Sequence, residues 1–119
     1  MAKPELEYFD TDGIEWTPVV GGVPGMYERV LAPDEEAGDL TRLAKWEPGV
    51  DTSPLGVQAH PYWEELYIVE GSMVDLTLGE TFSKGFYACR PPGMRHGPWL
   101  TREGCVTFEI RRYPERRPG

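Results

Sequence analysis

The chain contains only two histidines, His60 and His96, and both stand in segments that also carry proline and glycine. His60 lies in the segment QAHPYWEELYIVEG at 58–71, four residues before Glu64, and His96 ends the segment GFYACRPPGMRH at 85–96. Neutral imidazole and ionised carboxylate side chains are ligands of divalent metal ions. The first question that the sequence raises is therefore whether the fold brings these three side chains to one point.

The spacing within the first segment requires a turn between its histidine and its carboxylate. Residues two apart on a β-strand face the same side at about 7 Å from each other, so Gln58 and His60 point the same way. In an unbroken strand Glu64 would lie roughly 13 Å beyond His60, which is too far for one shared ion. The Pro-Tyr-Trp sequence at 61–63 can supply the turn, because proline disfavours a strand interior. Glu64 then opens the returning strand, and the apolar residues that alternate with it predict that its carboxylate faces a core.

The second segment predicts a stiff turn followed by a histidine. Five residues separate Gly85 from Pro91, one separates Pro91 from Gly93, and two separate Gly93 from His96. Proline and glycine at these positions remove pairing positions from a sheet and favour a tight turn. We expect His96 to begin the strand that follows this turn.

The two segments resemble the two motifs of the cupin superfamily. The first fits the second half of the motif H-x(3)-E-x(6)-G at His60, Glu64 and Gly71, and the second fits G-x(5)-P-x-G-x(2)-H at every fixed position from Gly85 to His96. The local sequence is most similar to the cupin domain of ChrR-type anti-sigma factors and to related small dioxygenase-like cupins that cleave diketones or acyl-phenols. The resemblance implies an all-β double-stranded β-helix, a jelly roll of two antiparallel sheets, with a metal ion inside the barrel mouth.

The resemblance also implies a ligand set. Carried over by position, the metal ligands are Gln58, His60, Glu64 and His96, with Gln58 in the place of the first histidine of the family's H-x-H. The two histidines and the glutamate alone form the ligand set of a 2-His-1-carboxylate Fe(II) site. Gln58 either ligates through its amide oxygen or hydrogen-bonds a metal-bound water. One divalent ion is expected, Fe(II) being favoured and Zn, Mn or Ni possible; the alternative is a metal-free pocket in which the three side chains form a buried hydrogen-bonded cluster.

Two functions from different classes follow from this reading. The first is an enzyme, a mononuclear non-haem Fe(II) dioxygenase-like oxidoreductase acting on a small enolisable or phenolic substrate, with Glu64 also acting as a catalytic base. The second is a small-molecule-binding or sensing cupin, zinc-bound or metal-free, without turnover. The candidates to line the pocket mouth are Tyr62, Trp63, Tyr87, Met94 and Trp99. Three arginines can neutralise an anionic ligand, although each is more often a solvated residue: Arg90, Arg95 and Arg102.

The elements that must position these residues are short strands. The 119 residues suffice for one domain, and 14 glycines and 12 prolines divide the chain into β-rich runs. We predict an irregular lead-in at 1–13, a single domain at 14–113 and a basic tail at 114–119. Strands are expected at 14–22, 25–33, 40–49, 57–60, 65–71, 73–79, 86–90 and 105–113.

The charge and the cysteines bound the partners and the compartment. A net charge of -8 and a pI near 4.7 disfavour nucleic acid and anionic membranes as partners, because the field of the protein repels both. The N-terminal segment has no apolar signal region and no apolar run is long enough to cross a bilayer, so we expect a cytoplasmic protein. Cys89 and Cys105 are expected to be free, largely buried thiols. The resemblance further implies a homodimer with a small-molecule substrate.

Overall fold

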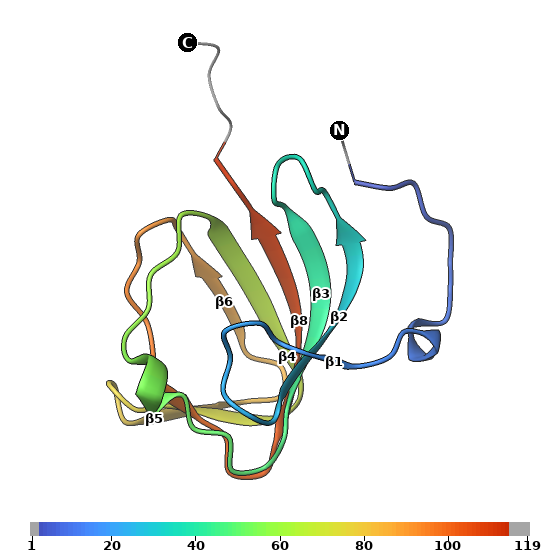
Figure 1. Cartoon of the computed structure of the whole chain (residues 1–119). Helices are drawn as coiled ribbons and strands as arrows, with labels where there is room; N and C mark the ends of the chain where they lie inside the picture. Colours follow the sequence, from blue (N-terminus) through green and yellow to red (C-terminus); the bar gives the residue numbers. More distant parts are fainter. Residues whose placement is uncertain (1–2, 115–119) are drawn as a thin grey trace.

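The computed structural model describes residues 3–114 as eight strands and two single 3-10 turns (Figure 1). The turns span Thr11–Gly13 and Ser53–Leu55. The strands are β1 (Thr17–Pro18), β2 (Met26–Pro33), β3 (Leu40–Trp46), β4 (Trp63–Asp75), β5 (Glu80–Ser83), β6 (Tyr87–Arg90), β7 (Trp99–Leu100) and β8 (Cys105–Arg112). No helix within residues 3–114 is long and apolar enough to cross a membrane.

All strand pairs are antiparallel, and β4 joins the two sheets of a curled barrel. The strand order is β1-β2-β3-β8-β4-β5, and β6 and β7 also pair with β4. The first part of β4, up to Gly71, pairs with β8 and β6 in one sheet, whereas Ser72–Asp75 pairs with β5 and β7 in the other. In Figure 1 the strands β6, β4, β8, β3 and β2 form one curved wall. The predicted all-β double-stranded β-helix is confirmed.

Gly71, the glycine that closes the first motif, stands where β4 changes sheet. The register between β4 and β8 shifts between Ile68 and Glu70, so the strand bends just before this point. Gly71 has a φ of 78°, and a Cβ atom there would lie 1.9 Å from the carbonyl oxygen of Gly104. A side chain is therefore excluded twice, by the left-handed backbone conformation and by the close approach of the neighbouring strand.

Strand alternation decides which side chains face the internal cavity of the barrel. Along β4 the set Glu64, Leu66 and Ile68 lines the internal cavity. The alternate residues face outward, and they include Trp63, Tyr67 and Val69, whose exposed fractions are 37%, 46% and 37%. The site therefore lies on the concave face of the wall that β4 shares with β8 and β6.

Several predicted element boundaries were wrong. The strand expected at 14–22 is reduced to Thr17–Pro18, because a turn over Val19–Gly22, closed by a hydrogen bond from the Gly22 amide to the Val19 carbonyl, follows it and Pro18 has no amide to donate. The strand expected at 57–60 is absent, and only Gln58 pairs there, in an isolated bridge with His96. The expected strands at 65–71 and 73–79 are one strand, β4, because the Gly71 bend allows it to pass between sheets. The short strands β5 and β7 were not predicted as separate elements.

The cysteines are free, but one of them lies at the surface. Cys105 is buried with an exposed fraction of 5%, whereas Cys89 is exposed. Cys89 was wrongly expected to be buried; its neighbours Ala88 and Arg90 line the cavity, so alternation along β6 turns the thiol outward. Of the tail predicted at 114–119, residues 115–119 lie outside the described residues.

Candidate metal centre

The structure brings His60, Glu64 and His96 together, although they come from three different segments. His60 lies in the loop before β4, Glu64 is the second residue of β4, and His96 follows the turn after β6. One ligand atom from each lies within 4.8 Å of the others. The two imidazole rings are tilted by 54° with their centroids 4.9 Å apart. This cluster is the group of potential ligands that the sequence placed in the two motifs.

Backbone hydrogen bonds between the two motifs hold the histidines next to each other. The amide of Gly93 donates to the carbonyl oxygen of His60 at 2.9 Å. Gln58 and His96 exchange two backbone hydrogen bonds of 2.8 and 2.9 Å. The amide of Met94 donates to the carbonyl of Pro91, and Gly93 supplies the positive φ of 83° that a tight turn needs at this position. The proline and glycine of the second motif therefore place His96 beside His60 of the first motif.

Both imidazoles are in the form that binds metals. Burial lowers the pKa of His60, and burial together with the nearby Arg90 charge lowers the pKa of His96. The Nδ1 of His96 lies 3.1 Å from the carbonyl oxygen of Met94, which can only accept, so Nδ1 carries the proton and Nε2 keeps its lone pair. Such a hydrogen bond to the second ring nitrogen is typical of metal-binding histidines, because it fixes the tautomer.

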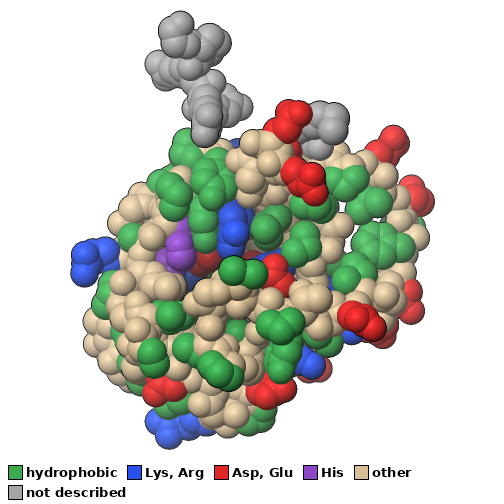
Figure 2. Space-filling view, in the orientation of Figure 1, with side chains coloured by type: hydrophobic (Ala, Val, Ile, Leu, Met, Phe, Trp, Pro, Cys, Tyr) green, Lys and Arg blue, Asp and Glu red, His purple; other side chains and the backbone are tan. Residues whose placement is uncertain are grey.

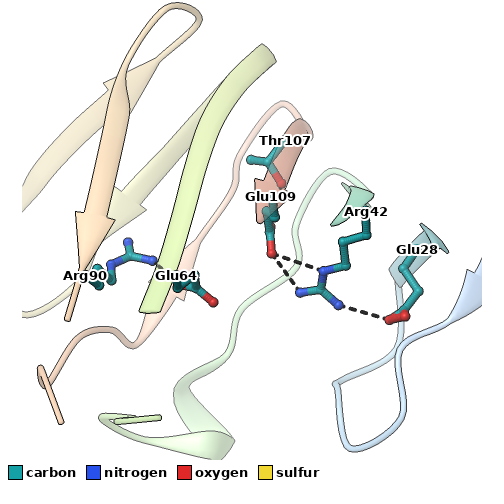
Figure 3. A network of polar contacts seen from close by, with 6 residues as sticks. All are labelled: Glu28, Arg42, Glu64, Arg90, Thr107 and Glu109. Atoms are coloured by element: carbon teal, nitrogen blue, oxygen red, sulfur yellow. Dashed lines mark hydrogen bonds and ion pairs between the residues drawn. The ribbon is translucent and has the colours of Figure 1, made fainter. Parts of the chain in front are cut away.

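Glu64 is held by an ion pair. It is buried on β4 between β6 and β8, which places Arg90 on one side of it and Arg111 on the other. The Nη1 of Arg90 lies 2.5 Å from Oε1 of Glu64 (Figure 3). This leaves Oε2 of Glu64 as a second oxygen that can face the histidines. The sequence had treated Arg90 as one of three candidate anion partners; it is buried, whereas Arg95 and Arg102 are exposed.

The donor set fits a divalent ion. Two nitrogen ligands and one carboxylate oxygen suit Fe(II), Zn or Mn, and a metal–ligand bond of about 2.1 Å keeps two ligand atoms within roughly 4.2 Å of each other. That limit applies to ligands on opposite sides of an ion, whereas adjacent ligands lie about 3.0–3.4 Å apart, so the 4.8 Å spread in the structure requires the most distant pair to close by roughly 1.5 Å on metal binding. Gln58 also lines this cavity, and its role as a metal ligand stays a prediction.

The cluster opens into an internal cavity of about 400 Å³, a size typical of small-molecule sites. In Figure 2 a histidine surface is visible inside a hollow, with basic and acidic side chains beside it. Its apolar wall is formed by Leu66, Ile68, Met73, Phe82 and Phe86. Of the aromatic and methionine residues predicted at the mouth, Tyr62, Tyr87 and Trp99 line the cavity that residues 3–114 form. Trp63 faces the outer side of β4 and Met94 is 45% exposed, and neither is part of that lining.

A second charged network, in which Arg42 and Glu109 line the cavity, was missed by the sequence analysis. Arg42 on β3 hydrogen-bonds the carboxylates of Glu28 on β2, at 2.9 Å, and Glu109 on β8, at 2.8 Å (Figure 3). Burial alone would raise the pKa of Glu109, but the Arg42 charge and hydrogen bonds from Thr107 and Arg42 outweigh it and lower that pKa. In the sequence, this network could have been recognised from the polar residues that alternate with apolar ones at 107, 109 and 111 of the strand 105–112.

A barrel of this topology with a His-Glu-His cluster in its interior defines a cupin. The chain belongs to the ChrR cupin-like domain family, because the sequence model of this family matches residues 4–113. This match confirms the resemblance that the two motifs indicated. No curated protein sequence matches the chain.

Three solved structures have a similar fold at low identity. A candidate acetylacetone dioxygenase from Methylibium petroleiphilum PM1 is 18% identical with a TM-score of 0.73, covering 92% of this chain and 78% of its own. An RmlC-like cupin from Shewanella frigidimarina NCIMB 400 is 21% identical with a TM-score of 0.70, and the match covers 97% of this chain and 96% of the Shewanella chain. An acetylacetone dioxygenase from Acinetobacter johnsonii is 15% identical with a TM-score of 0.69, and the match covers 90% of this chain and 72% of the Acinetobacter chain. At these identities the likeness shows the fold alone.

Proposed function

We propose that the protein is a mononuclear Fe(II) cupin that uses dioxygen to cleave a small enolisable or phenolic substrate. The observation that carries the proposal is the convergence of His60, Glu64 and His96, within 4.8 Å, on the wall of a cavity of about 400 Å³. Two similar structures belong to an acetylacetone dioxygenase and to a candidate for the same activity, which supports this reaction class. When bound, the ion supplies Lewis acidity and open coordination positions.

The residues of the cavity suit an enolate. The guanidinium groups of Arg90 and Arg111 lie on either side of Glu64, and their charge favours the anionic form of a bound enol or phenol. Burial raises the pKa of Tyr62 to about 12, so its phenol stays neutral and can donate a hydrogen bond. The apolar wall excludes water from the carbon skeleton. Glu64 accepts the substrate proton in this proposal if its Oε2, the oxygen outside the Arg90 contact, is only loosely bound to the ion.

The test is metal content and oxygen uptake on the same protein. We expect about one iron per chain in protein purified without chelator, and oxygen consumption with acetylacetone or 2-hydroxyacetophenone. His96→Ala and His60→Ala should each abolish both iron retention and uptake, because the chain has no third histidine to replace either ligand. Arg95→Gln, an exposed change next to His96, is the matched control and should retain both. Iron-loaded protein that consumes no oxygen with any β-diketone, acyl-phenol or β-keto acid would refute the oxygenase.

One observation favours a second function, a small-molecule-binding cupin without turnover. Arg90 already gives the Glu64 carboxylate a cationic partner, so this buried carboxylate is satisfied without a metal ion. Stoichiometric zinc with no oxygen uptake, or a metal-free protein that binds small molecules, supports this function.

The expected homodimer is part of the proposal. The outer face of β4 exposes Trp63, Tyr67 and Val69, which offer an apolar surface to a second copy. Sedimentation velocity should give twice the monomer mass, and Tyr67→Glu should shift the protein to the monomer. A monomer at micromolar concentration would contradict the dimer and leave the metal site unaffected.

A further inference from the structure

Arg111 is the cavity-lining arginine whose charge is not paired. Arg42 contacts two carboxylates and Arg90 contacts one, each at 2.9 Å or less. Within residues 3–114, no carboxylate oxygen lies within 4.0 Å of Arg111, and its Nε is buried without a hydrogen-bond partner. The buried Nε is closed to a ligand, but Arg111 lines the cavity with a guanidinium that no carboxylate of these residues neutralises, and this group can take an anion from outside the chain.

The guanidinium is positioned to receive such an anion next to the metal cluster. Its carbon lies 4.4 Å from the ring centroid of Tyr62, which fixes the plane of the fork over an aromatic face. Tyr62 in turn stacks on His60, with ring centroids 4.8 Å apart and planes within 4°. Arg111, Tyr62 and His60 therefore form a continuous stack from the unpaired charge to the cluster. A guanidinium stacked by its face keeps its N–H edge free for a planar partner.

We propose that Arg111 binds the carboxylate of the ligand, so that the substrate class is a small keto acid rather than a neutral diketone. The carboxylate takes the edge formed by the two Nη groups of Arg111, because Nε is buried, and the keto oxygen points toward the His60, Glu64 and His96 cluster. The assignment of a substrate rests on the proposed function, whereas the carboxylate site itself requires no metal.

The surrounding charges select a monoanion. Glu109 lies two residues before Arg111 on the same face of β8, and Glu64 is its pairing neighbour on β4. The three arginines Arg42, Arg90 and Arg111 and the three glutamates Glu28, Glu64 and Glu109 already sum to zero net charge, so a phosphate dianion is disfavoured more strongly than a monoanion. A planar carboxylate also matches the two parallel donors of the fork. The apolar wall of the cavity then accommodates the rest of a small acid.

The competing explanation is that Arg111 only offsets the charge of Glu109, whose pKa it helps to lower. A residue in that role would affect stability and leave the preference between charged and neutral ligands unchanged. The two explanations therefore differ in ligand selectivity, which can be measured on folded protein.

The experiment compares acetoacetate with acetylacetone, which share a skeleton and differ by a carboxylate in place of an acetyl group. Isothermal titration calorimetry should show that the wild-type protein as purified binds acetoacetate at least tenfold more tightly than acetylacetone. Arg111→Gln should reduce acetoacetate affinity about tenfold or more and change acetylacetone affinity little. Arg111→Lys, which keeps the charge without the fork, should lie between them. Arg112→Gln is the matched control, because Arg112 is the next residue on β8 and is exposed.

Repeating the titrations with chelator-treated and zinc-loaded protein separates this inference from the proposed function. An acetoacetate preference that persists without metal and disappears in Arg111→Gln supports the carboxylate site even if the protein proves to be no oxygenase. Equal affinity of wild-type protein for both ligands overturns it, as does an equal loss of both in Arg111→Gln. Circular dichroism melts check folding, and if Arg111→Gln is unfolded, the Arg111→Lys selectivity decides.

Discussion

Replacing Gly71 by alanine should destabilise the protein strongly, although Gly71 has no side chain in the site. The new Cβ would lie 1.9 Å from the carbonyl oxygen of Gly104 and 3.0 Å from the Cα of Cys105. Both contacts are with backbone, so no side-chain rotation relieves them and β4 must move away from β8. The move breaks the 3.2 Å hydrogen bond from the Ser72 amide to Gly104, a loss of about 1 kcal/mol. The left-handed φ of 78° adds about 1–2 kcal/mol for any residue with a Cβ.

Together these effects predict a loss of at least about 3 kcal/mol in the free energy of unfolding, including the disturbed packing. Urea unfolding followed by tryptophan fluorescence gives the measurement. Gly79→Ala is the matched control, because Gly79 has a φ of 71° and no atom within 4 Å of the position that a Cβ would take, so only the backbone cost of about 1–2 kcal/mol applies. A Gly71→Ala loss no larger than that of Gly79→Ala would refute the reasoning.

Three further predictions concern the buried charges and the thiols. Arg90→Met should lower the stability of metal-free protein by about 3 kcal/mol, because Glu64 loses its ion-pair partner. Arg90 and a metal ion compete for the charge of the Glu64 carboxylate, so the same variant should bind zinc at least tenfold more tightly in a competition with a chelating dye. Unchanged zinc affinity would contradict this competition. The pKa of Glu109 is lowered in the folded state, so its carboxylate stabilises the fold above the ordinary value of 4.5 and loses this effect as the pH falls. Glu109→Gln should therefore be less stable than wild type at pH 7, with a difference that narrows below pH 4.5 in urea unfolding series; a constant difference would argue against this linkage. Burial raises the pKa of Cys105 to about 11, so iodoacetamide at pH 8 should modify Cys89 alone in native protein and both thiols in guanidinium, as peptide mass spectrometry can verify.

Local patterns in the sequence predicted much of the fold. The strands at 26–33, 40–46 and 105–112 follow from short runs bounded by glycine, proline or polar turns, as their positions in the structure confirm. The runs at 14–22 and 57–60 have similar composition but lack neighbours along their length, so they form little or no strand. Hydrogen bonding to a second strand is not visible in a single segment, which is why these two predictions were wrong.

Strand β8 shows how far alternation alone can mislead. Its residues Val106, Phe108 and Ile110 are apolar, and the alternate set of Thr107, Glu109 and Arg111 is polar. Judged by the segment alone, the apolar set would face the core. In the structure the polar set lines the cavity, because Arg42 on β3 and the cluster on β4 provide partners for it.

By itself the sequence determined the cupin motifs, the β-rich architecture and the identity of the two histidines and the glutamate, because each depends on residue type and on spacing over a few residues. Only the tertiary structure decided that Arg90 pairs with Glu64, that Arg42 bridges Glu28 and Glu109, and that Arg111 lacks an acidic partner within residues 3–114. The hydrogen-bonded pairs among these residues join strands that lie 14 to 67 residues apart in the chain. Charge pairing across a barrel is set by strand register and by the direction of each side chain, and neither is contained in the local pattern of one strand.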